Sequence, residues 1–310
     1  TQKLYINYSS YQSDSALAYA RKNLQAAKIL KDSDKLNQAE INLVSIMGTL
    51  GMYKEGIDIL NSISISPASS LKGSFYDVSR TIYGQMSENA SSLQEKEKYI
   101  LLSKKYRDSS VSFYPTNSVS YIIAKADWNL DYKKPDETLR LLLPYFPKIH
   151  HSDSNRAIIY YIISQAYKQK NDRLKEKEWL SISALSDLQL SKKEYISLRS
   201  LAFLLYEDGD IERAYTYIKR SLDDAVVCNA RLRTYEISKM LPIISESYQL
   251  QNETNRFQLT VFLISASFLA LVLLTLLFLL FKQMKKLSKA KSDLSLANDK
   301  LSELNTELNT

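Results

Sequence analysis

The residue types that most often carry out catalysis or hold metal ions are scarce in this sequence. His150 and His151 are adjacent in a polar segment, and Cys228 is the single cysteine. A structural zinc site needs four converging ligands, and a catalytic site needs a base with a partner in reach, so two neighbouring histidines indicate an exposed loop. We also find no Gly-rich phosphate loop and no G-x-S-x-G nucleophile motif. We therefore expect no enzymatic activity, no metal and no cofactor in residues 1–310.

Binding is a more promising kind of chemistry, because several aromatic and hydrogen-bonding residues fall on the helix faces that would line a concave surface. Aromatic faces beside amide and guanidinium groups suit a peptide, or sugar rings that stack on them. For any one of these residues the alternative is a place in the protein core. The candidate ligand groove consists of Trp128, Tyr161, Gln165, Arg199, Phe203 and Tyr206.

The elements that must position these candidates are pairs of helices. Residues 198–225, LRSLAFLLYEDGDIERAYTYIKRSLDDA, have apolar residues at helical spacing on both sides of a Gly209-Asp210 turn. Small residues, Ala202 and Ala214, stand where two helices would cross closely. This arrangement resembles a tetratricopeptide repeat, in which a short turn joins two antiparallel helices.

Related units precede this one, at residues 41–60, 121–143 and 157–185, with turns expected at Gly51, at Asp131-Tyr132 and at Asn171-Asp172. Gly and Pro are few, six of each, which argues against a sheet with many hairpins. We predict an all-α fold, a tetratricopeptide-like α-solenoid over residues 1–255. Its first long helix is expected to be capped by Ser13 or Asp14.

A membrane-spanning helix is predicted at residues 256–281. No charged residue occurs from position 257 to 281, and such a run is long enough to cross the roughly 30 Å hydrocarbon core as a helix. Five lysines follow within ten residues, whereas Arg256 is the only charge just before it. The positive-inside rule then places residues 1–255 in the periplasm and the C-terminus in the cytoplasm, in a bacterial inner membrane. Export needs a signal peptide, so Thr1 is expected to begin a processed chain.

Residues 282–310 are predicted to form a cytoplasmic coiled-coil stub. Apolar residues repeat every seven positions, which is typical of a two-stranded seam and of a homodimer. The pattern is still running at the last residues, as though the chain were truncated there. The seam residues are Leu287, Leu294, Leu301 and Leu308, with Ala290, Ala297 and Leu304 between them.

The net charge of +7 does not indicate a nucleic-acid-binding surface. Residues 257–310 hold six Lys and four acidic residues, so the first 256 residues carry a net charge of only +5, spread among many acidic side chains. No stretch there interleaves basic and aromatic residues along one face, as a phosphate-binding groove needs.

Four segments together resemble one family: YQSDSALAYARKNLQAAKILKD, NLVSIMGTLGMYKEGIDIL, SKKYRDSSVSFY and KAKSDLSLANDKLSELNTELN. The chain resembles the membrane-bound, tetratricopeptide-type transcriptional regulators of Gram-negative bacteria, of the starch-utilisation regulator type. The resemblance implies a periplasmic sensing domain and, after this chain, a cytoplasmic helix-turn-helix domain that binds DNA. It supplies no ligand-binding residues.

The expected function is signal transduction. The solenoid senses a glycan fragment or a protein partner, and the membrane helix and coil relay its state to the missing output domain. Two alternatives share this layout. One is the sensor region of a histidine kinase, whose phospho-accepting histidine would lie beyond Thr310. The other is a membrane-tethered scaffold that recruits periplasmic proteins.

Overall fold

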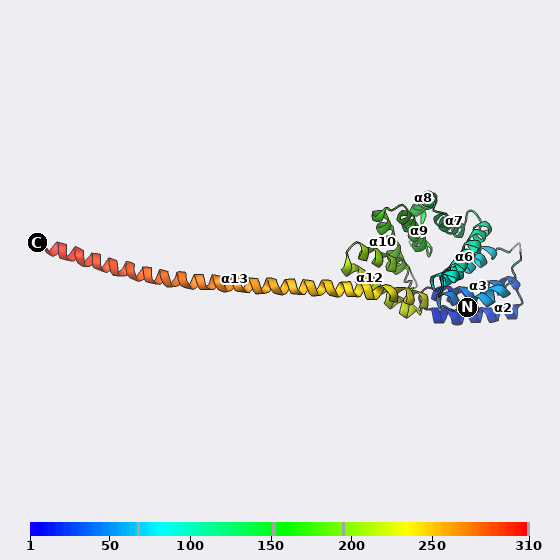
Figure 1. Ribbon diagram of the computed structural model, residues 1–310, viewed down its shortest axis with the longest axis horizontal. Helices are drawn as coiled ribbons and strands as arrows, with labels where there is room; N and C mark the ends of the chain where they lie inside the picture. Colours follow the sequence, from blue (N-terminus) through cyan, green and yellow to red (C-terminus); the bar gives the residue numbers. More distant parts are fainter. Residues whose placement is uncertain (67–68, 151–152, 194–195, 309–310) are drawn as a thin grey trace. The chain divides into compact units, whose positions relative to one another are not determined.

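The computed structural model describes residues 1–66, 69–150, 153–193 and 196–308, and all regular structure among them is helical (Figure 1). The chain divides into two compact units, Thr1–Tyr248 and Gln249–Thr310. The prediction of an all-α repeat fold is confirmed. The predicted domain limits at residues 255 and 281 fall inside one continuous helix, and they stay predictions.

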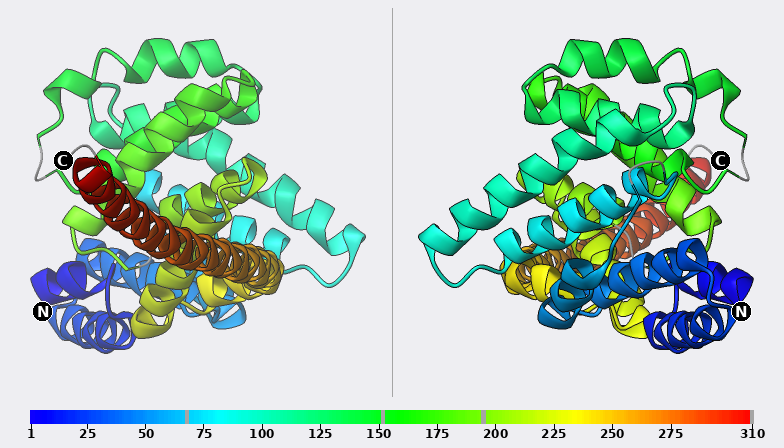
Figure 2. Two further views of the ribbon diagram at one scale, coloured as in Figure 1. Left: turned by 90° about the vertical axis from the view of Figure 1, so that its left-hand side faces the viewer. Right: turned by 90° about the vertical axis from the view of Figure 1, so that its right-hand side faces the viewer.

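In the described part of the chain, twelve α-helices and one short 3-10 helix precede the last, very long helix. They follow one another as antiparallel neighbours around an arc, as Figure 2 shows for the unit Thr1–Tyr248. Their bounds are α1 Gln2–Tyr8, α2 Ser13–Leu30, α3 Ser33–Thr49, α4 Tyr53–Ser62, α5 Lys72–Glu88, α6 Leu93–Phe113, α7 Val119–Asp131, α8 Pro135–Leu142, η1 Phe146–Lys148, α9 Arg156–Gln169, α10 Arg173–Gln189, α11 Ser197–Glu207 and α12 Ile211–Cys228.

The turns inside four of the helical pairs are built in the same way. Gly51, Lys133, Asn171 and Gly209 each have a positive φ, between 57° and 81°, two residues before the second helix begins. The following residue donates its N–H to a carbonyl five residues back, which satisfies an otherwise free group at the helix end. These bonds are Met52 to Met47 at 2.9 Å, Lys134 to Asn129 at 2.8 Å, Asp172 to Tyr167 at 3.0 Å and Asp210 to Leu205 at 2.9 Å.

These turns confirm the predicted repeats, with one shift. In the unit at 121–143 the turn was expected at Asp131-Tyr132, but α7 continues to Asp131 and the left-handed residue is Lys133. A lysine gives no sequence signal for this conformation, which ordinary L-residues adopt at a cost.

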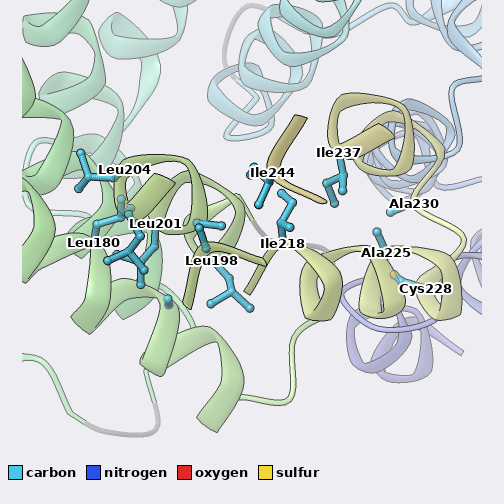
Figure 3. Packing of buried hydrophobic residues seen from close by; sticks show 14 residues of the cluster. Leu180, Leu198, Leu201, Leu204, Ile218, Ala225, Cys228, Ala230, Ile237 and Ile244 are labelled. Carbon is cyan, nitrogen blue, oxygen red and sulfur yellow. The ribbon is translucent and has the colours of Figure 1, made fainter. Parts of the chain in front are cut away.

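Buried apolar residues shared between consecutive helices form the core. The largest cluster joins α10, α11 and α12 to the first turns of α13, which runs from Arg231 to Leu308. In Figure 3, Ile244 and Ile237 of α13 lie beside Ile218 of α12. Each of these three isoleucines is at most 1% exposed. The first turns of α13 are therefore part of the solenoid core.

The start of the solenoid contacts its other end. The Ser13 hydroxyl lies 3.5 Å from the Cys228 Sγ, and the Asn229 side-chain amide donates to both oxygens of Asp14 at 3.0 and 3.1 Å. The prediction that Ser13 or Asp14 caps α2 is wrong, because Gln12 occupies the N-cap position. Both side chains instead join the first and last parts of the solenoid.

The unit Gln249–Thr310 consists of the remainder of α13. Within the described chain, one helix, Arg231–Asn305, is long and apolar enough to cross a membrane. The mean hydropathy of its most apolar segment is 2.8, and no part of that segment is buried in the protein. This fits a single-pass membrane protein. The described seam leucines Leu287, Leu294 and Leu301 are all more than 60% exposed, so their pairing with a second chain stays a prediction.

Candidate ligand-binding groove

A groove of about 790 Å³ lies within the unit Thr1–Tyr248, where the concave faces of α9 and α11 meet the first turns of α13. Its volume is in the range of small-molecule sites. The end of α5, the start of α6 and the start of α10 complete its walls. Most side chains that line the groove are charged, polar or aromatic, and they include Glu88, Lys96, Tyr161, Gln165, Lys168, Arg173, Glu176, Arg199, Ser200, Phe203, Glu207, Glu236, Lys239 and Met240.

The structure brings four of the six predicted candidates together in this groove. Tyr161 and Gln165 are one turn apart on α9, and Arg199 and Phe203 are one turn apart on α11. Side chains four residues apart lie on the same face of a helix. The face of each first helix that points away from the core could therefore be predicted from the sequence, and these four residues lie on it. Phe203 is 37% exposed, so its ring is open to solvent in the groove.

The other two candidates lie outside the groove. Trp128, on α7, donates its indole N–H to Asp108 at 2.8 Å, and the ammonium of Lys125 lies 3.7 Å from its ring centroid. Tyr206, on α11, packs half-buried against the core cluster, and its hydroxyl lies 3.4 Å from that of Ser247. Both side chains already have partners within the solenoid.

Several lining residues were not predicted because they come from elements distant in sequence. Glu236, Lys239 and Met240 belong to α13, which has no place in any of the helical pairs that the sequence predicts. Glu88 is the last residue of α5, and Lys96 lies near the start of α6. Helical periodicity shows which face of a helix is buried, but it does not show which later helix covers it.

At one end of the groove, two guanidinium groups share one carboxylate. Glu236 forms ion pairs with Arg199 of α11 and with Arg233 of α13, the latter at 3.0 Å. The three side chains are between 12% and 16% exposed. Hydrogen-bonded ion pairs that are this well shielded hold their geometry, so they join α11 to α13.

The same carboxylate is hydrogen-bonded to Glu88 of α5. Glu88 as a residue is exposed, but its carboxyl group faces the groove, where neighbouring side chains shield it from water. This shielding, with the hydrogen bond and charge of Glu236, raises the pKa of Glu88 to about 7. Partial burial alone would raise the pKa of Glu236, but the hydrogen bond with Glu88 and the charges of Arg233 and Arg199 lower it. Glu88 therefore holds the proton of the pair.

At the other end, the α11–α12 turn is fastened to α10. Arg173 donates to Glu207 at 3.1 Å and to Asp208 at 2.5 Å. Glu176, one turn further along α10, is 7% exposed, and its shielding from water raises its pKa. Among the described residues, no cation lies within ion-pair distance of Glu176.

The groove is not arranged as a metal centre. In the described chain, no group of three His, Cys, Asp or Glu side chains is placed to hold a metal ion. His150 is exposed, and His151 lies outside the described residues. The arrangement can bind a polar ligand through charged groups, an amide and an aromatic ring.

Comparison with protein families gives one match. The family model described as the SusR N-terminal TPR domain matches residues 1–239, which cover every helix of the solenoid and the start of α13 up to the groove. None of the curated proteins compared with the chain matches it.

Proposed function

Because the chain belongs to the SusR N-terminal TPR domain family, we propose that it is the sensing and membrane-anchoring part of a transcriptional regulator. The groove binds a signal, either a glycan fragment or a protein segment. Helix α13 relays the bound state to an output domain that binds DNA and lies beyond this chain. The solenoid is periplasmic, and the C-terminus is cytoplasmic.

One observation carries this proposal: the helix that forms a wall of the groove is the helix that holds the apolar run. Glu236, Lys239 and Met240 line the groove, and α13 continues without a break to Leu308. A ligand that binds between α11 and α13 has different contacts with α13 in its bound and free states, and such a difference is what a relay requires.

The cytoplasmic part of the proposal is a homodimer through the heptad seam. Leu287, Leu294 and Leu301 recur at the spacing of a two-stranded coiled coil and are exposed in the single chain. Paired helices would carry a rotation or shift of α13 to two output domains at once.

The test is a transcript measurement in the organism that carries the gene. Transcripts are compared during growth on a set of purified polysaccharides for the wild type, a deletion strain and a strain with Phe203→Ala in the encoded protein. We expect one polysaccharide to induce a set of genes in the wild type, and both altered strains to lose this induction. Phe113→Ala is the matched control, because Phe113 is 42% exposed on α6 and lies outside the groove.

The outcomes separate a sensor that controls transcription from the membrane-tethered scaffold. Unchanged transcripts in the deletion strain would exclude a regulator and favour the membrane-tethered scaffold. Loss of induction on deletion, but not with Phe203→Ala, would leave a regulator whose signal binds elsewhere on the solenoid.

Orientation is tested separately by labelling single cysteines in intact cells. In a Cys228→Ser background, Lys22→Cys on α2 should react with a membrane-impermeant maleimide, whereas Lys300→Cys should react only after lysis. Labelling in the opposite pattern would reverse the proposed topology.

A further inference from the structure

Four of the five lysines that follow the apolar run lie on one side of α13. This set, called the lysine face below, consists of Lys282, Lys285, Lys286 and Lys289 in one continuous helix. At about 100° per residue, their spacing confines them to an arc of about 100°, and Lys291 lies on the opposite side. The positive-inside rule depends on the number of basic residues and not on their position around the helix. It therefore does not explain why four of them share one side.

The lysine face keeps a net positive charge. All four residues are exposed, and among the described residues none of them forms an ion pair. The nearest acidic residue in the sequence is Asp293, four positions after Lys289. One carboxylate cannot balance four ammonium groups. The lysine face therefore attracts an anion from outside this segment.

The lysine face begins directly after the apolar run that is expected to cross the membrane. The run ends at Phe281, and the four lysines fall within the next eight positions, which span about 12 Å of helix. The headgroup region on each side of a bilayer is roughly 5–8 Å thick, and a lysine side chain can extend several ångströms along the helix toward it. The ammonium groups are therefore at the level of the lipid phosphates.

The lysine face is also separate from the predicted coiled-coil seam. Leu287, Ala290 and Leu294 follow a line on the helix that lies about 110° around its axis from the centre of the lysine face. In a parallel pair of helices the seam contacts the second chain, so the lysines would face the surrounding lipid. A second copy of the chain is therefore not the partner that this face fits, and α13 can contact both at once.

We propose that the lysine face of α13 binds the anionic headgroups of phospholipids in the cytoplasmic leaflet. The inference rests on the proposed function, because it assumes that the apolar run crosses the membrane in the proposed orientation. An ammonium group donates to phosphate oxygens, and a leaflet that contains anionic lipid supplies such oxygens beside every lysine. Because the lysines occupy one side of the helix, this binding favours one rotational setting of α13. The lipid composition of the membrane then influences the resting state of the relay.

The test reconstitutes the full chain in phosphatidylcholine bilayers that contain a trace of spin-labelled phosphatidylglycerol or spin-labelled phosphatidylcholine. Electron spin resonance resolves the lipid whose motion is restricted by the protein, and it gives the relative association of the two lipids. We expect phosphatidylglycerol to associate at least about threefold more strongly than phosphatidylcholine at 50 mM NaCl. At 500 mM NaCl this preference should fall below about 1.5-fold, since salt screens exposed charges.

Two double variants, each with two charges removed, distinguish the lysine face from positive charge in general. Lys286→Gln with Lys289→Gln should reduce the preference for phosphatidylglycerol to below about twofold. Lys291→Gln with Lys300→Gln is the matched control and should leave the preference unchanged. Lys291 lies on the opposite side of the helix, and Lys300 lies about 28 Å beyond Phe281.

The contrary outcomes can be distinguished from one another. If lipid is restricted but the wild type shows no preference, the chain spans the bilayer and the inference is wrong. If no lipid is restricted, membrane anchoring and the proposed function fail as well. An equal loss of preference in both variants would show that charge alone selects the lipid. If there is no lipid preference, but the wild type retains a fluorescent DNA duplex that the Lys286→Gln, Lys289→Gln variant releases, the partner is a soluble polyanion.

Discussion

Replacing Ile237 by alanine tests whether the first turns of α13 are held by the solenoid core, as the relay requires. Ile237 is 1% exposed and belongs to the cluster that joins α10, α11, α12 and α13. The substitution removes three buried carbons at about 0.8 kcal/mol each, or roughly 2.4 kcal/mol. The cavity left behind adds to this loss, because a packed core relaxes only in part. We therefore expect Ile237→Ala to lower the free energy of unfolding by about 3–4 kcal/mol.

Urea unfolding of the full chain in nanodiscs, followed by tryptophan fluorescence, measures this loss. Both tryptophans, Trp128 and Trp179, lie in the solenoid, so the signal reports on that unit alone. The control is Ile243→Ala, the same substitution on the same helix at a side chain that is 54% exposed. This control substitution should lower the free energy of unfolding by less than about 1 kcal/mol. If the two variants lose equal stability, or neither loses any, α13 is not packed on the solenoid as described.

Three further outcomes are expected. The raised pKa of Glu88 means that the folded protein holds a proton that the unfolded chain releases at lower pH, so stability should be highest on the acid side and fall as the pH rises through about 7. Glu88→Gln should flatten this dependence in thermal unfolding between pH 5.5 and 8, and an unchanged slope would assign it to another group. Gly209→Ala should lower the free energy of unfolding in urea by about 1–2 kcal/mol; the φ of 81° is the cause, because no neighbouring atom would clash with the added methyl group. Gly84→Ala, inside α5, should not lower it, and equal effects of the two substitutions would contradict backbone strain at Gly209. Leu294→Asn should reduce the yield of chemically cross-linked dimers about tenfold, whereas Leu296→Asn, outside the heptad seam, should leave it unchanged. An equal loss of cross-linked dimer in both variants would exclude the predicted seam.

The helical pairs could be predicted from the sequence because each pair is specified by residues close together in the chain. Apolar residues at spacings of three and four mark the buried face, and Gly51, Asn171 and Gly209 mark turns that need a positive φ. The sequence places the turn between α7 and α8 one or two residues before Lys133, since a lysine, unlike Gly or Asn, does not indicate a positive φ.

The groove could be predicted only in part, because periodicity within one helix does not show which distant helix lies against it. Residues on α9 and α11 follow from the position of those helices in their repeats, and Tyr161, Gln165, Arg199 and Phe203 were found in this way. The wall supplied by α13 depends on how the solenoid curves, which is a sum of many small packing angles. Trp128 satisfied the same local rule, yet it lies on α7 with Asp108 and Lys125 as its neighbours, away from the groove.

The contact between the two ends of the solenoid also limits how this protein can change in evolution. Repeat proteins with free ends gain or lose whole repeats, because each repeat touches only its neighbours. Here Ser13 meets Cys228 across 215 positions in the chain. Adding or deleting one helical pair would move the two ends apart and break the bonds between Asp14 and Asn229. The number of repeats is therefore fixed by closure, and new binding specificities must arise by substitution within the groove.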